Sequence, residues 1–170
     1  ISLARHFEYA AKHDSLTGLY NRREGGARLT GEYSRFQRHG NQFSILLLDI
    51  DLFKRINDTW GHEAGDLIIR QVANSLTHLS RKSDVVARWG GEEFLIILPE
   101  AGSDDAVQMA QRIREHVAAG RVRYQNQQLS VTTSIGVATI QANEALDNLL
   151  RRADENLYAA KSGGRNMVVV

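Results

Sequence analysis

Residues 84–98 read DVVARWGGEEFLIIL, and this stretch decides the fold of the chain. Residues 84–89 predict a short strand, and residues 94–98 predict a second strand that is almost entirely apolar. Two adjacent glycines between such runs are typical of a two-residue hairpin turn, because both central residues then need a positive φ that glycine adopts freely. The pair Glu92-Glu93 directly after the turn is unusual. On this stretch alone, two solvated glutamates flanking a strand are the simpler interpretation.

Composition sets broad limits on the class of protein. The chain has 170 residues, 42% of them hydrophobic, which is enough for one domain with a real core. A formal net charge of +1 gives no indication of binding to nucleic acid or of direct contact with an anionic membrane surface. The absence of cysteine excludes a disulfide scaffold and a thiolate metal site, and it suits a reducing compartment such as the cytoplasm.

Two features of the sequence concern its cellular context. No apolar run approaches the roughly 20 residues that a membrane-spanning helix needs, and no signal peptide is visible. The first residue is Ile1 and not methionine, so we expect a fragment of a longer protein. The parent protein could itself be anchored in a membrane.

Hydrophobic periodicity predicts an alternation of helices and strands along the chain. The expected helices cover residues 1–12, 21–39, 52–60, 62–79, 103–120 and 145–161. The expected strands beyond the hairpin cover residues 43–51, an edge strand at 167–170, and a second hairpin over 121–140 with 129–138 as its long strand. Residues 43–51 form a continuous apolar run, which is typical of a central strand buried on both faces. This order predicts an α/β (α+β) fold with a mixed, mainly antiparallel central sheet and helices packed against it.

Two aspartates, Asp49 and Asp51, end the buried strand. A carboxylate in that place is costly to desolvate unless it is paired or binds a metal. Either residue could instead cap the next helix, and Asp51 could do only that. If the hairpin lies beside this strand, Asp49 and Glu92 reach the same edge of the sheet. Two or three hard oxygens with open positions suit Mg²⁺, which keeps several waters and shares itself with substrate phosphates.

Basic residues occur where such phosphates would lie. Lys54 follows the strand, and Lys161 and Arg165 surround the glycine-rich end of the last helix. Each of them alone is most simply a solvated surface charge. Together with the acids they describe a site for a metal ion and a triphosphate.

Several motifs occur in a fixed order along residues 13–170. They are DSLTGL at 14–19, NRR at 21–23, DIDLFKRIND at 49–58, WGH at 60–62, GD at 65–66, GGEEF at 90–94 and KSGGRN at 161–166. This series resembles the GGDEF family, the diguanylate cyclases of bacterial signalling. Glu92 stands where the family name has aspartate, which is the other common active form. Residues 1–12 are then expected to be the end of an upstream signalling helix.

The resemblance implies a palm-like nucleotidyl-cyclase fold with a five-stranded core sheet and a peripheral hairpin. It implies that two GTP molecules condense into cyclic di-GMP with release of two pyrophosphates. Mg²⁺, with Mn²⁺ as the alternative, would be held by Asp49, Glu92 and the backbone carbonyl of Ile50, and it would lower the pKa of the attacking ribose 3′-hydroxyl. Glu92 would also help to remove that proton, and Glu93 would contact the metal or support its ligands.

The resemblance also assigns substrate contacts. The residues it places on the β- and γ-phosphates are Phe53 and Lys54, with their backbone N–H groups, and the side chains of Lys54, Lys161 and Arg165. It makes Asn57 and Asp66 the readers of guanine. The chemistry agrees, because guanine presents N–H donors at N1 and N2 that amide and carboxylate oxygens accept, whereas adenine has an acceptor at N1.

A second set of residues resembles the inhibitory product site of this family. Arg81 and Asp84 lie three residues apart just before the hairpin, and Arg112 would add a contact from a neighbouring domain. Arginine can bind guanine O6 and N7 in a bidentate manner. Each domain holds one GTP and the product has two-fold symmetry, so the resemblance implies an antiparallel homodimer. It also implies an upstream sensor module that controls this dimer.

Three alternatives remain at the level of the sequence. The domain could be an inactive receptor that binds cyclic di-GMP through Arg81 and Asp84, a GTP-binding regulator, or a cyclase for another nucleotide. The first is disfavoured because the catalytic set of Asp49, Lys54, Glu92, Lys161 and Arg165 is complete. An active enzyme with product feedback is therefore the expectation.

Overall fold

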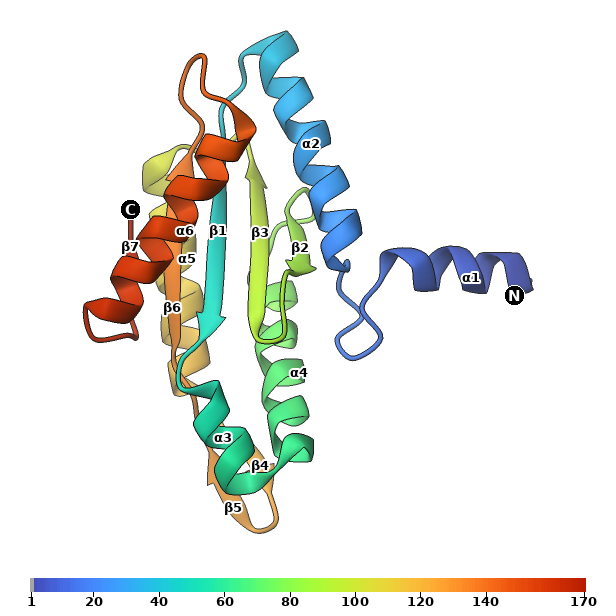
Figure 1. Ribbon diagram of the computed structural model, residues 1–170, viewed down its shortest axis with the longest axis vertical. Helices are drawn as coiled ribbons and strands as arrows, with labels where there is room; N and C mark the ends of the chain where they lie inside the picture. Colours follow the sequence, from blue (N-terminus) through green and yellow to red (C-terminus); the bar gives the residue numbers. More distant parts are fainter. Residues whose placement is uncertain (1) are drawn as a thin grey trace.

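The computed structural model describes residues 2–170 and contains the predicted mixture of helices and strands (Figure 1). The helices are α1 (Leu3–Lys12), α2 (Arg22–His39), α3 (Phe53–Trp60), α4 (His62–Leu79), α5 (Ser103–Ala119) and α6 (Leu146–Ser162). The strands are β1 (Phe43–Ile50), β2 (Val85–Arg88), β3 (Glu93–Pro99), β4 (Val122–Tyr124), β5 (Gln127–Leu129), β6 (Thr133–Thr139) and β7 (Val168–Val169).

The central sheet has five strands in the order β2-β3-β1-β6-β7. Neighbouring strands are antiparallel except for β6 and β7, which are parallel. Strand β1 lies in the middle and is buried at every position, as its continuous apolar run predicts. The predicted fold class, a mainly antiparallel five-stranded sheet with flanking helices, is confirmed.

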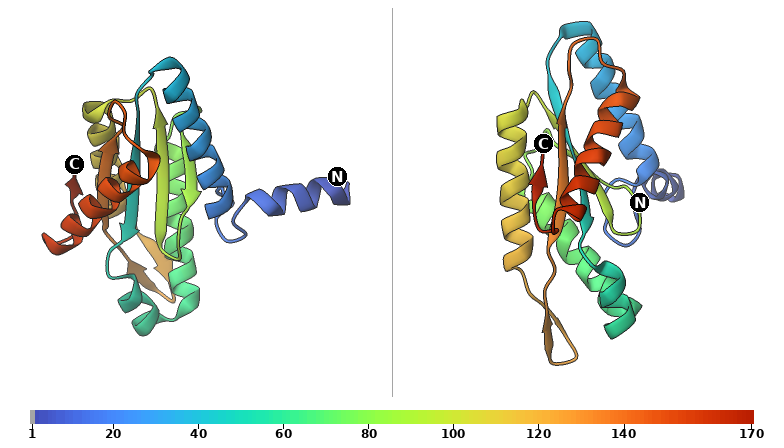
Figure 2. Two further views of the ribbon diagram at one scale, coloured as in Figure 1. Left: turned by 45° about the horizontal axis from the view of Figure 1, so that its top comes forward. Right: turned by 60° about the vertical axis from the view of Figure 1, so that its left-hand side comes forward.

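Helices cover both faces of the sheet, which Figure 2 shows in its right-hand view. One core lies between the sheet and helices α4 and α5, and it includes Leu46 and Leu48 of β1. The other lies under α2 and α6 and includes Ile45 and Leu47. This alternation is the period of two of a β-strand, so β1 supplies both cores.

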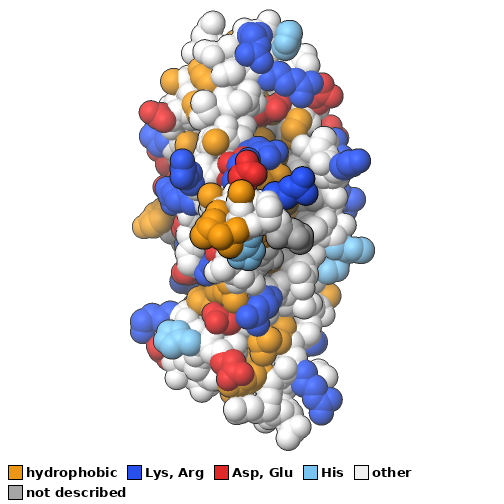
Figure 3. Space-filling model, turned by 90° about the vertical axis from the view of Figure 1, so that its right-hand side faces the viewer, with side chains coloured by type: hydrophobic (Ala, Val, Ile, Leu, Met, Phe, Trp, Pro, Cys, Tyr) orange, Lys and Arg blue, Asp and Glu red, His pale blue; other side chains and the backbone are white. Residues whose placement is uncertain are grey.

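Helix α1 leaves the body of the domain and buries no residue (Figure 1). Leu3, Phe7 and Tyr9 on it are exposed, and hydrophobic side chains lie around its projecting end in Figure 3. Hydrogen bonds nevertheless connect the end of α1 to the domain. The Asn21 N–H donates to the carbonyl of Lys12 at 2.9 Å, and the Asn21 Nδ2 donates to the carbonyl of Ala11 at 3.0 Å.

Aromatic stacking reinforces this junction. The ring of His13 stacks on Tyr9 with 3.9 Å between centroids and on Tyr20 with 5.0 Å. The direction of α1 is therefore fixed by contacts at its last turn. Among residues 2–170, no helix combines the length and the apolar character that crossing a bilayer requires.

The predicted second hairpin differs from the observed one. Strands β4 and β5 pair only with each other in a separate two-stranded sheet, which is the expected peripheral hairpin. The predicted long strand over 129–138 is wrong, because residues 130–132 break it and β6 begins at Thr133. At this break the Asp51 N–H donates to the carbonyl of Thr132 at 2.9 Å, so the chain changes from one sheet to the other where β1 ends.

The predicted two-residue turn between β2 and β3 is also wrong. Arg88 pairs with Phe94 as the last residues of the ladder, so the connection is longer than the two glycines. Neither Gly90 nor Gly91 has a positive φ. The Glu93 carbonyl instead accepts hydrogen bonds from the Trp89 and Gly90 N–H groups at 2.8 and 3.2 Å, which form a wider turn. Glycine at position 90 provides room, because a Cβ there would lie 3.1 Å from the Glu93 Oε2.

Candidate active site

Asp49 is the centre of the site at the end of β1. In the sheet it lies opposite Glu93 of β3 and Ser134 of β6, and it is buried. The Lys161 Nζ, from the last turn of α6, donates to the Asp49 Oδ2 at 2.7 Å. Burial raises the pKa of the Asp49 carboxyl to about 6, with the Lys161 hydrogen bond and charge lowering it and the charges of Glu92 and Glu93 raising it. Three carboxylates and one ammonium group therefore act on one another at this edge of the sheet.

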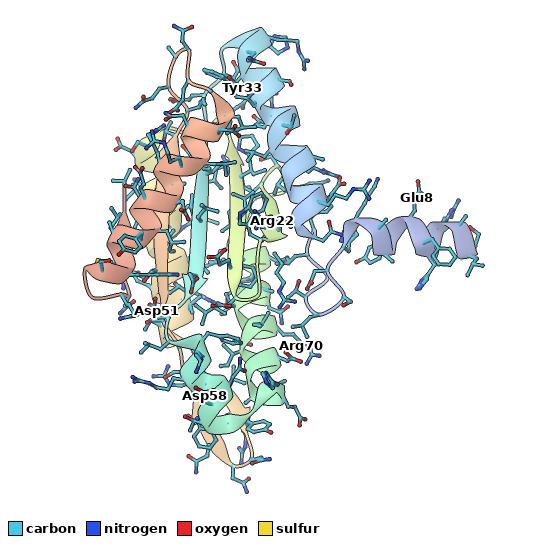
Figure 4. The ribbon with its side chains drawn as sticks, in the orientation of Figure 1. Glu8, Arg22, Tyr33, Asp51, Asp58 and Arg70 are labelled. Carbon is cyan, nitrogen blue, oxygen red and sulfur yellow. The ribbon has the colours of Figure 1, made fainter. Side chains whose placement is uncertain are left out.

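The turn brings Glu92 to β1 through the backbone. The Ile50 N–H donates to the carbonyl of Glu92 at 3.2 Å. Glu93 takes a different direction and lines a hollow of about 450 Å³ between α2 and α6, together with Arg22 and Trp89. Figure 4 shows Arg22 between α2 and β3, and its guanidinium lies over the Trp89 ring at 4.4 Å. Of the two glutamates, Glu92 is thus the one tied to Ile50.

The acids fit a hard divalent cation. Their negative charge exceeds the single positive charge of Lys161, and the pKa of Asp49 is raised first by burial and to a smaller extent by the charges of Glu92 and Glu93. No cluster of three or more His, Cys, Asp or Glu side chains within residues 2–170 has metal-binding geometry. Mg²⁺ is commonly bound by one or two carboxylates plus waters and substrate phosphates. Asp49, Glu92 and the Ile50 carbonyl are the oxygens that would hold it.

The N-terminus of α3 lies directly after this carboxylate edge. Leu52 precedes the helix in a left-handed conformation with φ 54°, and no side chain caps the helix. The N–H groups of its first turn, which includes Phe53 and Lys54, can therefore bind an anion. The Lys54 ammonium pairs with Asp58 on the outside of α3 at 2.9 Å, and the Lys54 side chain is 88% exposed (Figure 4 labels Asp58). It is an exposed charge near the site.

The packing of α3 against α4 places Asn57 against Gly65, the residue that precedes Asp66. A Cβ on Gly65 would lie 2.0 Å from the Asn57 Oδ1, so glycine is required at position 65 for this side chain to fit. The Asn57 Oδ1 is buried and has no hydrogen-bond partner among residues 2–170. Asp66 is the next residue on α4. A buried amide oxygen without a partner is unfavourable in the free protein and suits a site that receives a donor from a ligand.

The three residues of the predicted product site also lie together. Arg81, Asp84 and Arg112 line a hollow of about 300 Å³. The Arg81 Nη2 donates to the Asp84 Oδ1 at 3.1 Å and to the carbonyl of Pro99 at 3.2 Å. Arg112 projects into the same hollow from α5 and contacts the sulfur of Met109 at 3.2 Å.

Comparison with known proteins identifies the family. A family model described as Diguanylate cyclase, GGDEF domain matches residues 11–167. The chain belongs to the GGDEF family. The response regulator PleD of Caulobacter vibrioides is 45% identical over 159 residues, which are 92% of this chain and 35% of PleD. The diguanylate cyclase DgcM of Escherichia coli is 41% identical over 171 residues, which are 98% of this chain and 40% of DgcM.

The chain thus spans between a third and two-fifths of the length of these two curated relatives. Solved structures agree with the GGDEF fold. The GGDEF domain of DgcB from Caulobacter crescentus, in complex with c-di-GMP, has a TM-score of 0.91 and 35% identity, covering 94% of this chain and 95% of that one. The diguanylate cyclase SiaD from Pseudomonas aeruginosa, in complex with its activator SiaC, has a TM-score of 0.92 and 41% identity, covering 98% and 64%.

The structure of this GGDEF domain corrects the interpretation of Asp51 as a helix cap. It makes no capping bond to α3. Its Oδ2 accepts from the Thr132 hydroxyl at 2.7 Å and from the Asn166 N–H at 2.9 Å, and its Oδ1 accepts from the Ser134 hydroxyl at 2.6 Å. Sequence reasoning missed these contacts, because the partners lie 81 to 115 residues away.

Sequence reasoning also missed Arg88, which holds the turn of the GGDEF domain. Its guanidinium donates to the carbonyl of Gly91 at 2.8 and 3.1 Å and to Asp14 at 3.1 and 3.2 Å. Asp14 in turn accepts from the N–H and the hydroxyl of Thr17 at 2.9 and 2.8 Å. The loop after α1 is thereby connected to the residue before Glu92. The only sequence signal was an arginine inside the hairpin, which is not specific.

Proposed function

We propose that this GGDEF domain is a diguanylate cyclase, which condenses two GTP molecules into cyclic di-GMP and releases two pyrophosphates. The observation that carries the proposal is the meeting of Asp49, the Glu92 turn and Lys161 at one sheet edge beside the uncapped N-terminus of α3. This arrangement offers oxygens for a cation next to N–H and ammonium donors for phosphates. The names of relatives such as DgcM support the same activity.

The metal of this reaction would be Mg²⁺, with Mn²⁺ as the alternative, held by Asp49, Glu92 and the Ile50 carbonyl. When bound, it supplies charge neutralisation and a lower pKa for the 3′-hydroxyl of the ribose. Lys161 neutralises Asp49 in the structure of the free protein. From this position at the end of α6, the Lys161 ammonium would bind phosphate oxygens and stabilise the departing pyrophosphate.

The remaining contacts orient the two ends of GTP. The first N–H groups of α3, at Phe53 and Lys54, together with the Lys54 and Arg165 side chains, bind the β- and γ-phosphates. Asn57 and Asp66 accept from the N–H groups of guanine, which gives the unpartnered Asn57 oxygen a donor. Glu93 supports the cation site from the neighbouring hollow and is not proposed as a ligand.

Catalysis requires two copies of the domain, because each holds one guanine site and the product is two-fold symmetric. Cyclic di-GMP would then inhibit by binding at Arg81, Asp84 and Arg112, where two guanidinium groups face one hollow. We further propose that residues 1–12 are the end of a helix from an upstream sensor module, which controls this dimer. We also propose a cytoplasmic location, with which a sequence free of cysteine is compatible.

The test of this proposal is pyrophosphate release from GTP and Mg²⁺ at several protein concentrations, with separation of the nucleotide products. We expect cyclic di-GMP, formed at a rate that rises faster than linearly with protein concentration. Binding of cyclic di-GMP without turnover, even after a dimeric coiled coil is fused ahead of α1, would contradict the proposal and favour an inactive receptor.

The variant Glu92→Gln sharpens this test. It keeps the size of the side chain and removes the charge that would hold the cation, so turnover should fall to background while circular dichroism and the unfolding midpoint stay unchanged. Glu93→Gln is the matched control, one residue further along, and should retain measurable turnover. If the Glu92 variant keeps its activity, Glu92 has no part in the mechanism.

A further inference from the structure

Asp51 is a buried carboxylate that the chemistry described above does not use. It lies immediately after β1, and Figure 4 shows it beside the end of α6. Both of its oxygens accept hydrogen bonds, from the hydroxyls of Thr132 and Ser134 and from the backbone N–H of Asn166. The first two partners belong to the chain at the start of β6. The third belongs to the turn that follows α6.

The bonds to Thr132 and Ser134 add little to the architecture of the sheet. The neighbouring backbone already pairs β1 with β6, with Asp49 opposite Ser134 and Ile50 opposite Thr133. The Asp51 N–H also donates to the Thr132 carbonyl. The bond to the Asn166 N–H is different, because it joins β1 to a turn that is not part of that strand pair.

The turn after α6 has an unusual backbone. Arg165 and Asn166 are consecutive residues with φ values of 64° and 48°, and neither is a glycine. L-residues other than asparagine adopt this left-handed region infrequently, and the chain has one other such pair among the described residues, Gln125-Asn126 in the turn between β4 and β5. The Arg165 N–H donates to the Ala160 carbonyl at 3.0 Å, and the Asn166 Oδ1 accepts from Arg114 of α5 at 3.2 Å. The Asp51 carboxylate supplies a buried contact within this turn, and the Ile135 N–H of β6 donates to the carbonyl of the next residue, Met167, at 3.0 Å.

We propose that Asp51 is a positioning residue that fixes the turn after α6, so that Arg165 is presented to the phosphates of the nucleotide. The inference rests on the proposed function, because Arg165 is assigned to the phosphates there. Asp51 itself touches neither nucleotide nor cation in this scheme. It couples the strand that carries Asp49 to the segment that carries Arg165, and so it sets the distance between the two halves of the triphosphate site.

The hydrogen-bonding properties of the three donors allow a positioning role of Asp51 to be distinguished from an effect of its charge. Thr132 and Ser134 have hydroxyls, which can donate or accept, whereas the Asn166 N–H can only donate. In an Asp51→Asn variant the amide oxygen can accept from Thr132 and Asn166 while the amide nitrogen donates to the Ser134 hydroxyl. All three bonds are then kept without the charge. In Asp51→Ala all three are lost.

The experiment compares direct binding of two ligands by calorimetry in the presence of Mg²⁺. The first is a non-hydrolysable GTP analogue, which needs both the phosphate and guanine contacts, and the second is GMP, which needs the guanine contacts alone. For Asp51→Ala we expect the analogue to bind about 10-fold more weakly, with unchanged affinity for GMP and faster hydrogen exchange at residues 160–167. Asp51→Asn should restore most of the lost affinity for the analogue.

The matched control is the double variant Thr132→Val/Ser134→Ala. It removes two of the three bonds of Asp51 but keeps the bond to Asn166, so the analogue should bind as in the wild type. Equal losses for the analogue and for GMP in Asp51→Ala would overturn the proposal, because they indicate general damage to the domain. No rescue by Asp51→Asn would also overturn it, because the charge would then be the essential property.

The outcome for the wild type separates this inference from the proposed function. If the wild-type protein binds the analogue and forms cyclic di-GMP while Asp51→Ala binds equally well, only the positioning role of Asp51 fails. If the wild type neither binds the analogue nor turns GTP over, the proposed function fails, and the positioning role fails with it.

Discussion

Two arginine–aspartate pairs flank strand β2. The distance between the charged atoms is the same in both, but the sequence separation and the exposure of the arginine differ. Arg81 and Asp84 lie before the strand, three residues apart, and Arg88 and Asp14 lie at its end, 74 residues apart. Both ion pairs measure 3.1 Å. The Arg81 side chain is 57% exposed and that of Asp84 is 1% exposed, whereas those of Arg88 and Asp14 are 20% and 19% exposed. The separation of two charges therefore says little about what the pair does.

The first pair lines a hollow in which we propose that cyclic di-GMP binds. Asp84 accepts from the Arg81 backbone N–H at 2.8 Å and from its side chain, which holds the turn before β2 in shape. The exposed guanidinium has five N–H donors and lines the hollow that Arg112 also reaches. Only the arginine of this pair is exposed, because the Asp84 side chain is 1% exposed. The role that we propose for this pair is the binding of a ligand in the hollow that it lines.

The second pair is a structural clamp. The Arg88 guanidinium is occupied by Asp14 and by the carbonyl of Gly91. Burial raises the pKa of the Asp14 carboxyl, but the hydrogen bonds from Thr17 and the charge and hydrogen bond of Arg88 outweigh it, and the net pKa lies below the ordinary value. The pair connects the loop after α1 to the turn that carries Glu92.

The largest effect is expected when the clamp is removed. Arg88→Met leaves Asp14 and the Gly91 carbonyl without their partner, so we expect a loss of about 2 kcal/mol of unfolding free energy. Turnover of GTP should fall about 100-fold, because the Glu92 turn is displaced. Urea denaturation and pyrophosphate release measure the two effects.

Arg81→Met is the matched control for this prediction, because it makes the same substitution in the other pair. It should cost less stability than Arg88→Met, because Asp84 keeps the hydrogen bond from the backbone N–H of residue 81. Similar losses of stability in the two variants would remove the distinction between a clamp and a presented charge.

A smaller effect is expected on inhibition by cyclic di-GMP when Arg81 is replaced. Arg81→Ala removes one guanidinium from the hollow, so the concentration of cyclic di-GMP that halves the rate should rise about 10-fold. The initial rate, before product accumulates, should stay close to that of the wild type. Progress curves with and without added cyclic di-GMP provide the measurement. Unchanged inhibition would place the product site elsewhere.

The smallest effect is expected on the pH dependence of the unfolding free energy. The pKa of Asp14 is lower in the folded than in the unfolded chain, so its ion pair stabilises the fold above the unfolded pKa of about 3.9. This contribution is lost as the pH falls through the folded pKa. The difference in unfolding free energy between the wild type and Asp14→Asn should therefore shrink from pH 5 to pH 3 in urea titrations. A difference that is constant over this range would show that the ion pair does not stabilise the fold.

The same two pairs show what could be predicted from the sequence. Arg81 and Asp84 are close in the chain, so a motif can display them, and the structure places Arg112 beside them. The bond of Arg88 to Asp14 depends on how the loop after α1 folds back onto β2, and no local pattern encodes that return. The contacts of Asp51 were missed for the same reason.

At two strand ends, local sequence patterns did not predict the observed structure. The continuous apolar run of β1 predicted its central place, because only a strand buried on both faces tolerates such a run. The Gly-Gly pair suggested a tight turn, but backbone bonds from Trp89 and Gly90 to the Glu93 carbonyl make a wider one. Alternation from Leu129 onward suggested one long strand, although the chain passes between two sheets there.

The junction of α1 with the domain has a mechanical consequence. Asn21 forms hydrogen bonds with the last turn of α1, and the His13 ring is stacked between Tyr9 and Tyr20. These contacts fix the angle between α1 and the domain. The Tyr20 carbonyl accepts from the Arg88 N–H at 2.8 Å. A rotation of α1 about its own axis must either break these contacts or exert a torque on Tyr20, and through Arg88 on the turn that carries Glu92.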